Sequence, residues 1–226
     1  MSWVITGAEK TPVDKLGIQS VSLLLHGDGT NGSTTITDSS PSPKTVTAVG
    51  NAQISTTQSK FGGASIAFDG SGDYLSIPAS SDFLFGTGAF TIEAWIYLLA
   101  TGQQHVYEAR TSGNGVLLYV NALTQLSFYS NGATRLTGET VATGQWNHIA
   151  VTRSSGETKL FLNGTPSASI FYDSQYYNSP TTSIFIGTNG VGGSYVNGYI
   201  DDLRITKGVA RYTSNFTPPT APFPDI

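Results

Sequence analysis

The sequence predicts an all-β protein built as a two-sheet antiparallel sandwich. Three observations support this fold class: short runs of alternating apolar and polar residues recur along the chain, Asn-Gly turns separate several of them, and helical periodicity is almost absent. A chain of 226 residues can bury a substantial core in one such domain.

Eight runs carry the alternating pattern of a strand. In TIEAWIYL at 91–98, the even-numbered residues from Ile92 to Leu98 are apolar and share one face, whereas the odd-numbered residues, including Glu93, share the other. We expect strands, in chain order, at 64–70, 73–78, 91–98, 116–120, 125–130, 147–153, 158–164 and 183–188.

Asn-Gly pairs favour the left-handed backbone dihedrals of tight hairpin turns. The clearest hairpin is expected in QLSFYS-NG-ATRLTG, where the pair at 131–132 joins two alternating runs. Several of the five pairs are expected to close antiparallel strands; they lie at 114–115, 131–132, 163–164, 189–190 and 197–198.

The two ends of the chain differ from the middle and predict three parts. Residues 1–20 form a polar N-terminal arm, 21–213 the sandwich domain, and 214–226 a C-terminal strap that holds four of the ten prolines. The strap is expected to be extended. The arm either lies along a sheet edge or docks into a larger assembly.

Composition excludes several functional classes. Eleven basic and fifteen acidic residues, without long runs of either sign, argue against nucleic-acid binding. The absence of cysteine excludes disulfides and thiolate metal sites. No stretch approaches the roughly 20 apolar residues of a membrane helix, so we predict no membrane insertion.

Four segments together resemble the laminin-G-like branch of the concanavalin A-like jelly rolls. They occur in the family's order at 22–40, 59–78 followed by 90–98, 144–164 and 184–219. The resemblance implies a concanavalin A-like jelly roll over nearly the whole chain. It does not define function, because this fold hosts lectins, adhesion modules, hydrolases and passive structural domains.

The first and last of these segments are most similar to versions found in bacteriophage virion proteins. There the domain serves as a capsid decoration, tail or fibre module. The resemblance therefore implies a virion component made in the cytoplasm of a bacterial host and released by lysis. The N-terminal residues MSWVITGAEKTPVDK contain no apolar core of signal-peptide length, which agrees with that route.

The adjacent acids of IDDLRI could suggest catalysis. Neighbouring strand residues point to opposite faces, so Asp201 and Asp202 cannot act as a pair unless a bulge intervenes. We expect one to face solvent and the other to accept hydrogen bonds from the backbone, Arg204 or Arg153. No strand carries the alternating acids typical of hydrolases on this fold, and no nucleophile, phosphate or zinc motif is present. We therefore predict no catalytic residues, and His148 is expected to be a structural histidine.

A calcium ion needs six or more oxygen ligands, several of them carboxylates. Pentraxin-like relatives provide acids in two loops where this chain has Asn114 and Asn189 but no acid. Asp28 and Asp38 flank the first Gly-rich loop and are expected to cap turns. We therefore predict no metal and no cofactor, with calcium the one ion left open.

The best candidate contact surface combines the loops FYDSQYYNSP (171–180) and GGSYVNGY (192–199). Tyrosine rings beside amide and carboxylate groups suit sugar recognition and protein interfaces alike, although Tyr176 and Tyr177 can instead close the core. The candidate ligand- or partner-binding residues are Asp173, Tyr176, Tyr177, Asn178, Tyr195 and Asn197.

Three functional hypotheses follow. The first is a non-enzymatic virion surface protein that binds other virion proteins and self-associates. The second is a carbohydrate-binding adhesin that recognises host surface glycans. The third, a glycoside hydrolase or lyase, ranks behind both because it requires distant acids such as Asp173 and Asp201 to meet in the fold.

Overall fold

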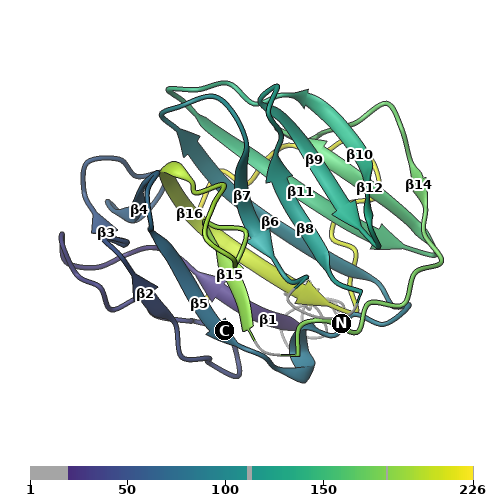
Figure 1. The fold of residues 1–226 in the computed structure, drawn as a ribbon, viewed down its shortest axis with the longest axis horizontal. Helices are drawn as coiled ribbons and strands as arrows, with labels where there is room; N and C mark the ends of the chain where they lie inside the picture. The colour runs from purple at the N-terminus through teal and green to yellow at the C-terminus, as the bar shows by residue number, and fades with distance from the viewer. Residues whose placement is uncertain (1–19, 111–113, 182, 226) are drawn as a thin grey trace, which may run out of the picture.

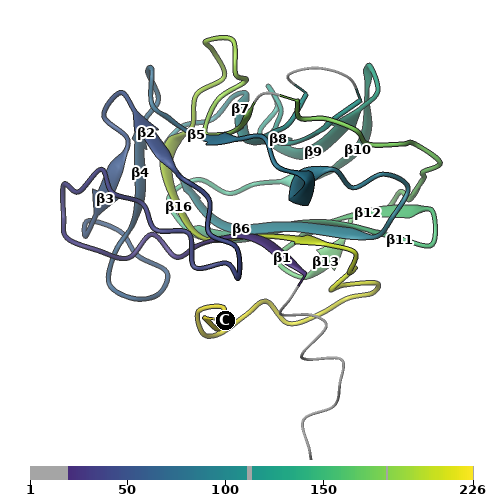
Figure 2. The same ribbon diagram turned by 90° about the horizontal axis from the view of Figure 1, so that it is seen from below.

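The computed structural model describes residues 20–110, 114–181 and 183–225. Within them the chain forms two antiparallel sheets of nine and seven strands, stacked as two layers (Figures 1 and 2). This confirms the predicted all-β, concanavalin A-like jelly-roll sandwich. Apart from Ser20, the predicted arm at 1–20 lies outside the described residues.

The nine-stranded sheet runs in the order β13-β12-β11-β6-β16-β4-β3, with β1 paired to β16 and β14 paired to β12. Its strands are β1 (Val21–Leu25), β3 (Gln53–Ser55), β4 (Ser65–Asp69), β6 (Phe90–Leu98), β11 (Trp146–Ser154), β12 (Glu157–Leu162), β13 (Thr165–Pro166), β14 (Phe171–Tyr172) and β16 (Asn197–Lys207).

The seven-stranded sheet runs in the order β10-β9-β8-β7-β15-β5-β2. A short 3-10 helix, η1 (Ser81–Phe83), follows β5 in the chain. The strands are β2 (Thr47–Val49), β5 (Tyr74–Pro78), β7 (Gln104–Glu108), β8 (Val116–Val120), β9 (Gln125–Ser130), β10 (Ala133–Thr140) and β15 (Ser183–Ile186).

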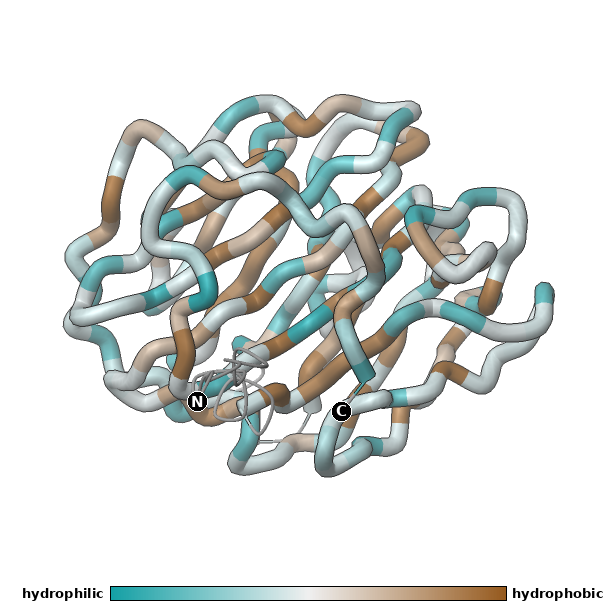
Figure 3. Tube along the Cα trace, turned by 180° about the vertical axis from the view of Figure 1, so that it is seen from behind, coloured by the Kyte–Doolittle hydropathy of each residue, from teal (hydrophilic) through white to brown (hydrophobic). Residues whose placement is uncertain are grey.

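The core lies between the two sheets and is built from the inward faces of the strands. Hydrophobic residues follow the strands, whereas hydrophilic residues gather mainly in the loops (Figure 3). In β6, Ile92, Ala94 and Ile96 belong to this core, as their alternation predicted. Glu93 points to the opposite face and is nevertheless fully buried.

Two of the Asn-Gly pairs form the turn of a hairpin, in which the strands before and after the turn pair with each other. Asn131 and Gly132 have φ values of 43° and 80° and join β9 to β10, which confirms the clearest predicted hairpin. Asn163 and Gly164 likewise join β12 to β13. The pair at 197–198 instead lies inside β16.

The C-terminal segment after β16 lies against the outer face of the nine-stranded sheet (Figure 2). The ring of Phe216 stacks on that of Tyr212 with their centroids 3.5 Å apart, and both rings meet the buried His148 edge-on. Further along, Phe223 is buried against Val21 and Leu24. Thus the Pro-rich segment closes a second, smaller core on this face.

A buried ion pair lies in this second core. Glu93 accepts hydrogen bonds from Nε and Nη2 of Arg204 at 2.9 and 2.7 Å, and from the Tyr212 hydroxyl at 2.7 Å. Nε2 of His148 lies 3.3 Å from the same carboxylate. His148 is fully buried and structural in position, as predicted.

The two acids of IDDLRI contradict the prediction that one of them faces solvent. A β-bulge shifts the register of β16 against β6 between Asp201 and Arg204, and Asp202 has a φ of 48°. The extra residue leaves both acids facing the outer side of the sheet, where both are buried. Asp201 accepts hydrogen bonds from the main-chain N–H groups of Lys60 and Phe61 at 2.7 and 3.1 Å.

Asp202 anchors the C-terminal segment. Its Oδ2 accepts a hydrogen bond from the N–H of Phe223 at 2.7 Å, and its Oδ1 pairs with Nδ1 of His26. The other ring nitrogen of His26 lies 3.0 Å from Asp225. The hydrogen bond with Asp202 raises the pKa of His26 above its usual value, although burial opposes the shift. Both acids therefore have structural partners.

Two further findings bear on the predicted functional classes. No helix in the described ranges is long and apolar enough to span a membrane. Those ranges also contain no group of three or more His, Asp or Glu side chains suited to a metal ion. Asp38 accepts hydrogen bonds from the main chain of Leu24, Ser40 and Lys44, the capping role predicted for it.

Candidate functional site

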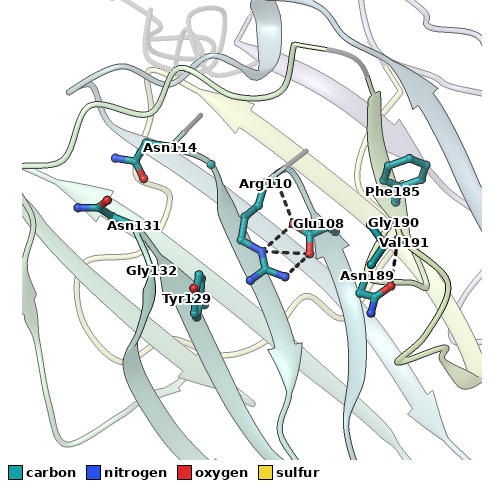
Figure 4. A pocket seen from close by; sticks show the side chains of 11 residues that line it. Glu108, Arg110, Asn114, Tyr129, Asn131, Gly132, Phe185, Asn189, Gly190 and Val191 are labelled. Atoms are coloured by element: carbon teal, nitrogen blue, oxygen red, sulfur yellow. Dashed lines mark hydrogen bonds and ion pairs between the residues drawn. The ribbon is translucent and has the colours of Figure 1, made fainter. Parts of the chain in front are cut away.

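Four strands of the seven-stranded sheet place side chains in one row on its outer face. Phe185 of β15 pairs with Glu108 of β7, Glu108 with Leu117 of β8, and Leu117 with Tyr129 of β9. Phe185, Glu108 and Tyr129 line a groove of about 680 Å³ that crosses these strands (Figure 4). The groove is therefore positioned by the sheet register.

An ion pair occupies the middle of the groove. Nε of Arg110 donates to both Glu108 oxygens at 2.8 and 3.1 Å, and the Arg110 main-chain N–H donates to Oε1 at 2.7 Å. The guanidinium carbon lies 4.5 Å from the centroid of the Tyr129 ring, a cation–π distance. Arg110 thus bridges the buried carboxylate and the aromatic ring (Figure 4).

The two charges of this pair hold each other ionised. Burial alone would raise the pKa of Glu108, but the hydrogen bonds from Arg110, together with His105 whose Nδ1 lies 3.5 Å away, outweigh it and lower the pKa below its usual value. Burial alone would lower the pKa of Arg110, but Glu108 outweighs that effect and raises it. The pair is therefore close to electrically neutral as a unit.

Amide side chains form one rim of the groove. Nδ2 of Asn131 donates to Oε1 of Gln175 at 2.8 Å, and the main-chain N–H of Asn114 donates to Oδ1 of Asn178 at 3.1 Å. These bonds tie loop 171–180 to the starts of β8 and β10. Oδ1 of Asn114 has no hydrogen-bond partner within the described part of the chain.

The opposite rim is the loop that follows β15. Oδ1 of Asn189 accepts a hydrogen bond from the N–H of Val191, and the Asn189 N–H donates to the carbonyl of Gly193. Val191 is 89% exposed at the tip. The groove thus has two partly exposed rings, Tyr129 and Phe185, a neutral ion pair between them, and amides on both rims. Such a site can stack a flat apolar surface and bind hydroxyl groups along its edges.

The structure separates the predicted contact residues of loop 171–180 into buried and exposed ones. Asp173 and Tyr177 are buried, and the Tyr177 hydroxyl donates to Oδ2 of Asp173 at 2.8 Å. Because they lie inside the fold, neither can contact a surface ligand. Tyr176 is 63% exposed, and Asn178 is exposed at the rim beside Asn114.

The second predicted loop does not join the first at one site. Tyr195 is only partly exposed. Asn197 lies on β16, in the other sheet, and lines a different cavity beside Tyr199. Asp173 and Asp201 likewise have separate sets of partners, since Asp173 bonds to Thr158 and Asp201 to the 60–61 main chain.

Sequence reasoning missed the side chains of the groove floor. Glu108 and Arg110 form an acid-x-Arg pattern at the end of a run that we did not assign as a strand, and that pattern was the available signal. Tyr129 was one of several tyrosines within runs of alternating apolar and polar residues. Asn114 and Asn189 were singled out only as poor calcium ligands, yet both border the groove.

Comparison with protein families gives one match. The model of the concanavalin A-like lectin/glucanases superfamily, of laminin G type, matches residues 69–211. These residues include most strands of both sheets and the whole groove. A search of curated proteins found no match.

Several solved structures share the fold. The binding domain of botulinum neurotoxin serotype D superposes with a TM-score of 0.65 at 16% identity, over 85% of this chain and 49% of that one. The binding domain of Paraclostridial Mosquitocidal Protein 1 gives 0.65 at 15% identity, over 84% and 49%. The chain therefore spans about half the length of these two domains.

A third structure matches over almost its full length. It is domain 4 of AbnA, a GH43 extracellular arabinanase from Geobacillus stearothermophilus, solved in complex with arabinotriose. It superposes with a TM-score of 0.61 at 18% identity, over 84% of this chain and 95% of that one. At such identities the three structures establish a shared fold.

Proposed function

Since the chain belongs to the concanavalin A-like lectin/glucanase superfamily, we propose that it is a non-enzymatic carbohydrate-binding protein whose ligand occupies the groove over β7, β8, β9 and β15. The observation that carries this proposal is the row of Tyr129, the Glu108–Arg110 pair and Phe185 across the outer face of the sheet.

The chemistry of the groove suits a sugar. The apolar face of a pyranose or furanose ring stacks on the flat ring of Tyr129, whereas its hydroxyls need donors and acceptors around its edge. The side-chain amides of Asn131 and Asn189 provide both along the rims. The arabinotriose complex of the AbnA domain shows that a relative with this fold binds an oligosaccharide.

The same groove does not suit glycoside hydrolysis. A glycosidase places two carboxyl groups across the scissile bond, one of them protonated. Of the described residues that line the groove, Glu108 is the sole carboxylic acid, and Arg110 holds it ionised. A single ionised carboxylate cannot provide the acid–base pair, so binding without cleavage is the proposed activity.

Replacing Tyr129 by leucine is expected to weaken glycan binding about 10- to 100-fold, the usual cost of losing an aromatic anchor at the centre of a site. Leucine keeps an apolar side chain on β9 but removes the flat ring that stacks on the sugar. A glycan array identifies the ligand, and isothermal titration calorimetry then compares the variant with the wild type.

The matched control is Tyr172→Leu, on β14 outside the groove, where the tyrosine is 77% exposed. Tyr172→Leu should bind the glycan with the same affinity as the wild type. An unchanged affinity in Tyr129→Leu would remove the groove as the binding site, and an array without a bound glycan would contradict carbohydrate binding itself.

We also propose that the protein works on the surface of a bacteriophage virion, as a capsid decoration, tail or fibre component in contact with other virion proteins and with copies of itself. The support is the resemblance of segments 22–40 and 184–219 to virion proteins. Mass spectrometry across a density gradient of purified particles should find the chain at a constant ratio to the capsid protein. A chain that stays at the top of the gradient would contradict this placement.

A further inference from the structure

Three aromatic residues form a second cross-strand row, on the opposite side of the sandwich. Trp146 of β11 pairs with Tyr97 of β6, and Tyr97 pairs with Tyr199 of β16. These residues share a face with Glu93 and so point away from the main core. We call these three residues the aromatic row.

The aromatic row lies beside the surface that the C-terminal segment covers. One step along the same strands, Trp95 and His148 are buried under Lys60 and Phe216. The rings of the aromatic row remain partly exposed. No polar atom of their side chains has a hydrogen-bond partner among the residues that the structure describes, so their edges are free to bind a ligand.

The spacing of the rings is regular. The centroids of Trp146 and Tyr97 are 5.6 Å apart, and those of Tyr97 and Tyr199 are 6.0 Å apart. Consecutive rings of a linear oligosaccharide have a similar repeat. Neighbouring rings are tilted by 67° and 77° to each other, so a chain laid across the strands would meet ring faces and ring edges in turn.

Polar groups flank the row at Tyr199. A cavity of about 500 Å³ begins there and is lined also by Asn197, Gln53 and Asp69. The side-chain amides of Asn197 and Gln53 have no hydrogen-bond partner in the described ranges, which leaves them available to sugar hydroxyls. Asp69 accepts a hydrogen bond from Nδ2 of Asn51 and adds a negative charge to the cavity.

From this arrangement we propose a second carbohydrate site, in which the aromatic row and the Asn197 cavity bind a neutral linear oligosaccharide that runs across β11, β6 and β16. Neutral sugars are favoured because an acidic sugar would face the carboxylates of Asp69 and Asp73 without a cation lining the cavity. The ligand class rests on the proposed function, whereas the site is independent of the groove.

Two sites on opposite outer faces have a functional consequence. One molecule could hold two glycan chains at once. Linked sites of this kind raise avidity without a new contact. This property distinguishes the proposed second site from a simple extension of the groove.

Tryptophan fluorescence tests the site, because Trp146 is part of the row. The probes are four neutral hexasaccharides: cellohexaose, xylohexaose, mannohexaose and chitohexaose. At least one is expected to change the emission of the full-length protein with a saturable dose response. The Trp146→Phe variant should lose that response, which assigns it to the row and not to Trp95 or Trp3.

Three tyrosine variants separate the two sites. Tyr199→Leu and Tyr97→Leu should each weaken the Trp146 response at least about tenfold, whereas Tyr129→Leu and the control Tyr172→Leu should leave it unchanged. Thermal unfolding confirms that each variant is folded. Retaining the full response in both row variants would overturn the second site.

The outcomes for the two sites are distinguishable. Loss of the response in Tyr129→Leu would also overturn the second site, because the signal would then originate in the groove. No Trp146 response to any probe, together with Tyr129-dependent binding on the array, would overturn the second site and leave the groove standing. A Trp146 response without Tyr129-dependent binding would support the second site and contradict the groove.

Discussion

The Glu93→Ala variant should lose about 3–5 kcal/mol of its free energy of unfolding, the usual cost of removing one partner from a buried ion pair. Glu93 is fully buried, and its removal leaves the guanidinium of Arg204, a buried residue, without its carboxylate. The Tyr212 hydroxyl loses its acceptor as well. Since domains of this kind are stable by only about 5–15 kcal/mol, this loss brings the protein close to unfolding.

The pH dependence of this effect follows from the pKa of Glu93. Burial alone would raise that pKa, but the Arg204 charge and contacts from His148 and Tyr212 outweigh it and lower the pKa from 4.5 to about 2. A carboxyl group with a lowered folded pKa stabilises fully above its unfolded pKa and loses that contribution as pH falls through its folded pKa. The difference in the free energy of unfolding between the wild type and Glu93→Ala should therefore shrink as the pH falls from 4.5 to 2.

Urea unfolding at pH 7 and at acidic pH measures both quantities. The control is Glu157→Ala, which removes a partly exposed carboxylate 3.4 Å from Lys159 and should change stability by about 0.5 kcal/mol or less. If both variants change the free energy of unfolding at pH 7 by the same small amount, the Glu93–Arg204 pair does not stabilise the second core.

Asp201→Asn should stabilise the protein at pH 8, by about 2–4 kcal/mol. Burial raises the pKa of Asp201 to about 7, with the neighbouring Asp202 and Asp28 carboxylates adding to the shift and the Lys60 and Phe61 hydrogen bonds opposing it. The Oδ1 atom has no partner within the described residues. Asparagine can keep accepting the two main-chain hydrogen bonds without carrying a buried charge.

The sign of the pH effect distinguishes this account from a packing effect. Because the folded pKa of Asp201 lies above its unfolded value of 3.8, the folded state binds the extra proton, and wild-type stability falls as pH rises from about 4 to 7. The advantage of asparagine should thus be absent near pH 4 and complete above pH 7. Asp69→Asn is the control, because the pKa of Asp69 is lowered, chiefly by the Asn51 hydrogen bond. This variant should therefore decrease the free energy of unfolding at pH 8, the opposite of the effect of Asp201→Asn. An advantage of Asp201→Asn that is equal at pH 4 and pH 8 would exclude the charge as its cause.

Much of the fold could be predicted because its signals are local. The alternation in TIEAWIYL assigned Ile92, Ala94 and Ile96 to the core, and the pair Asn131–Gly132 located a hairpin. The same local rules failed at Asp201 and Asp202. A bulge depends on how β16 pairs with both β6 and β1, and no spacing within the segment reveals it.

The candidate site could not be predicted for the same reason. Tyr176 and Tyr177 are neighbours in an aromatic loop, but Tyr177 turns inward to the core, and its hydroxyl bonds to Ser130 and Asp173. Tyr129 looked like one strand tyrosine among several. Its importance comes from the register that places it in line with Glu108 and Phe185, which are far away in the sequence.

Local patterns were enough to predict the fold class, many of the strands and the absence of disulfides, because alternation, turn residues and cysteine count act within short segments. Long-range contacts in the folded chain are needed for the rest: which outward-facing side chains meet in the groove and in the aromatic row, and how the C-terminal segment buries Glu93. Those arrangements arise when strands far apart in the chain pair in one register, and pairing energy is a property of both partners, not of either segment alone.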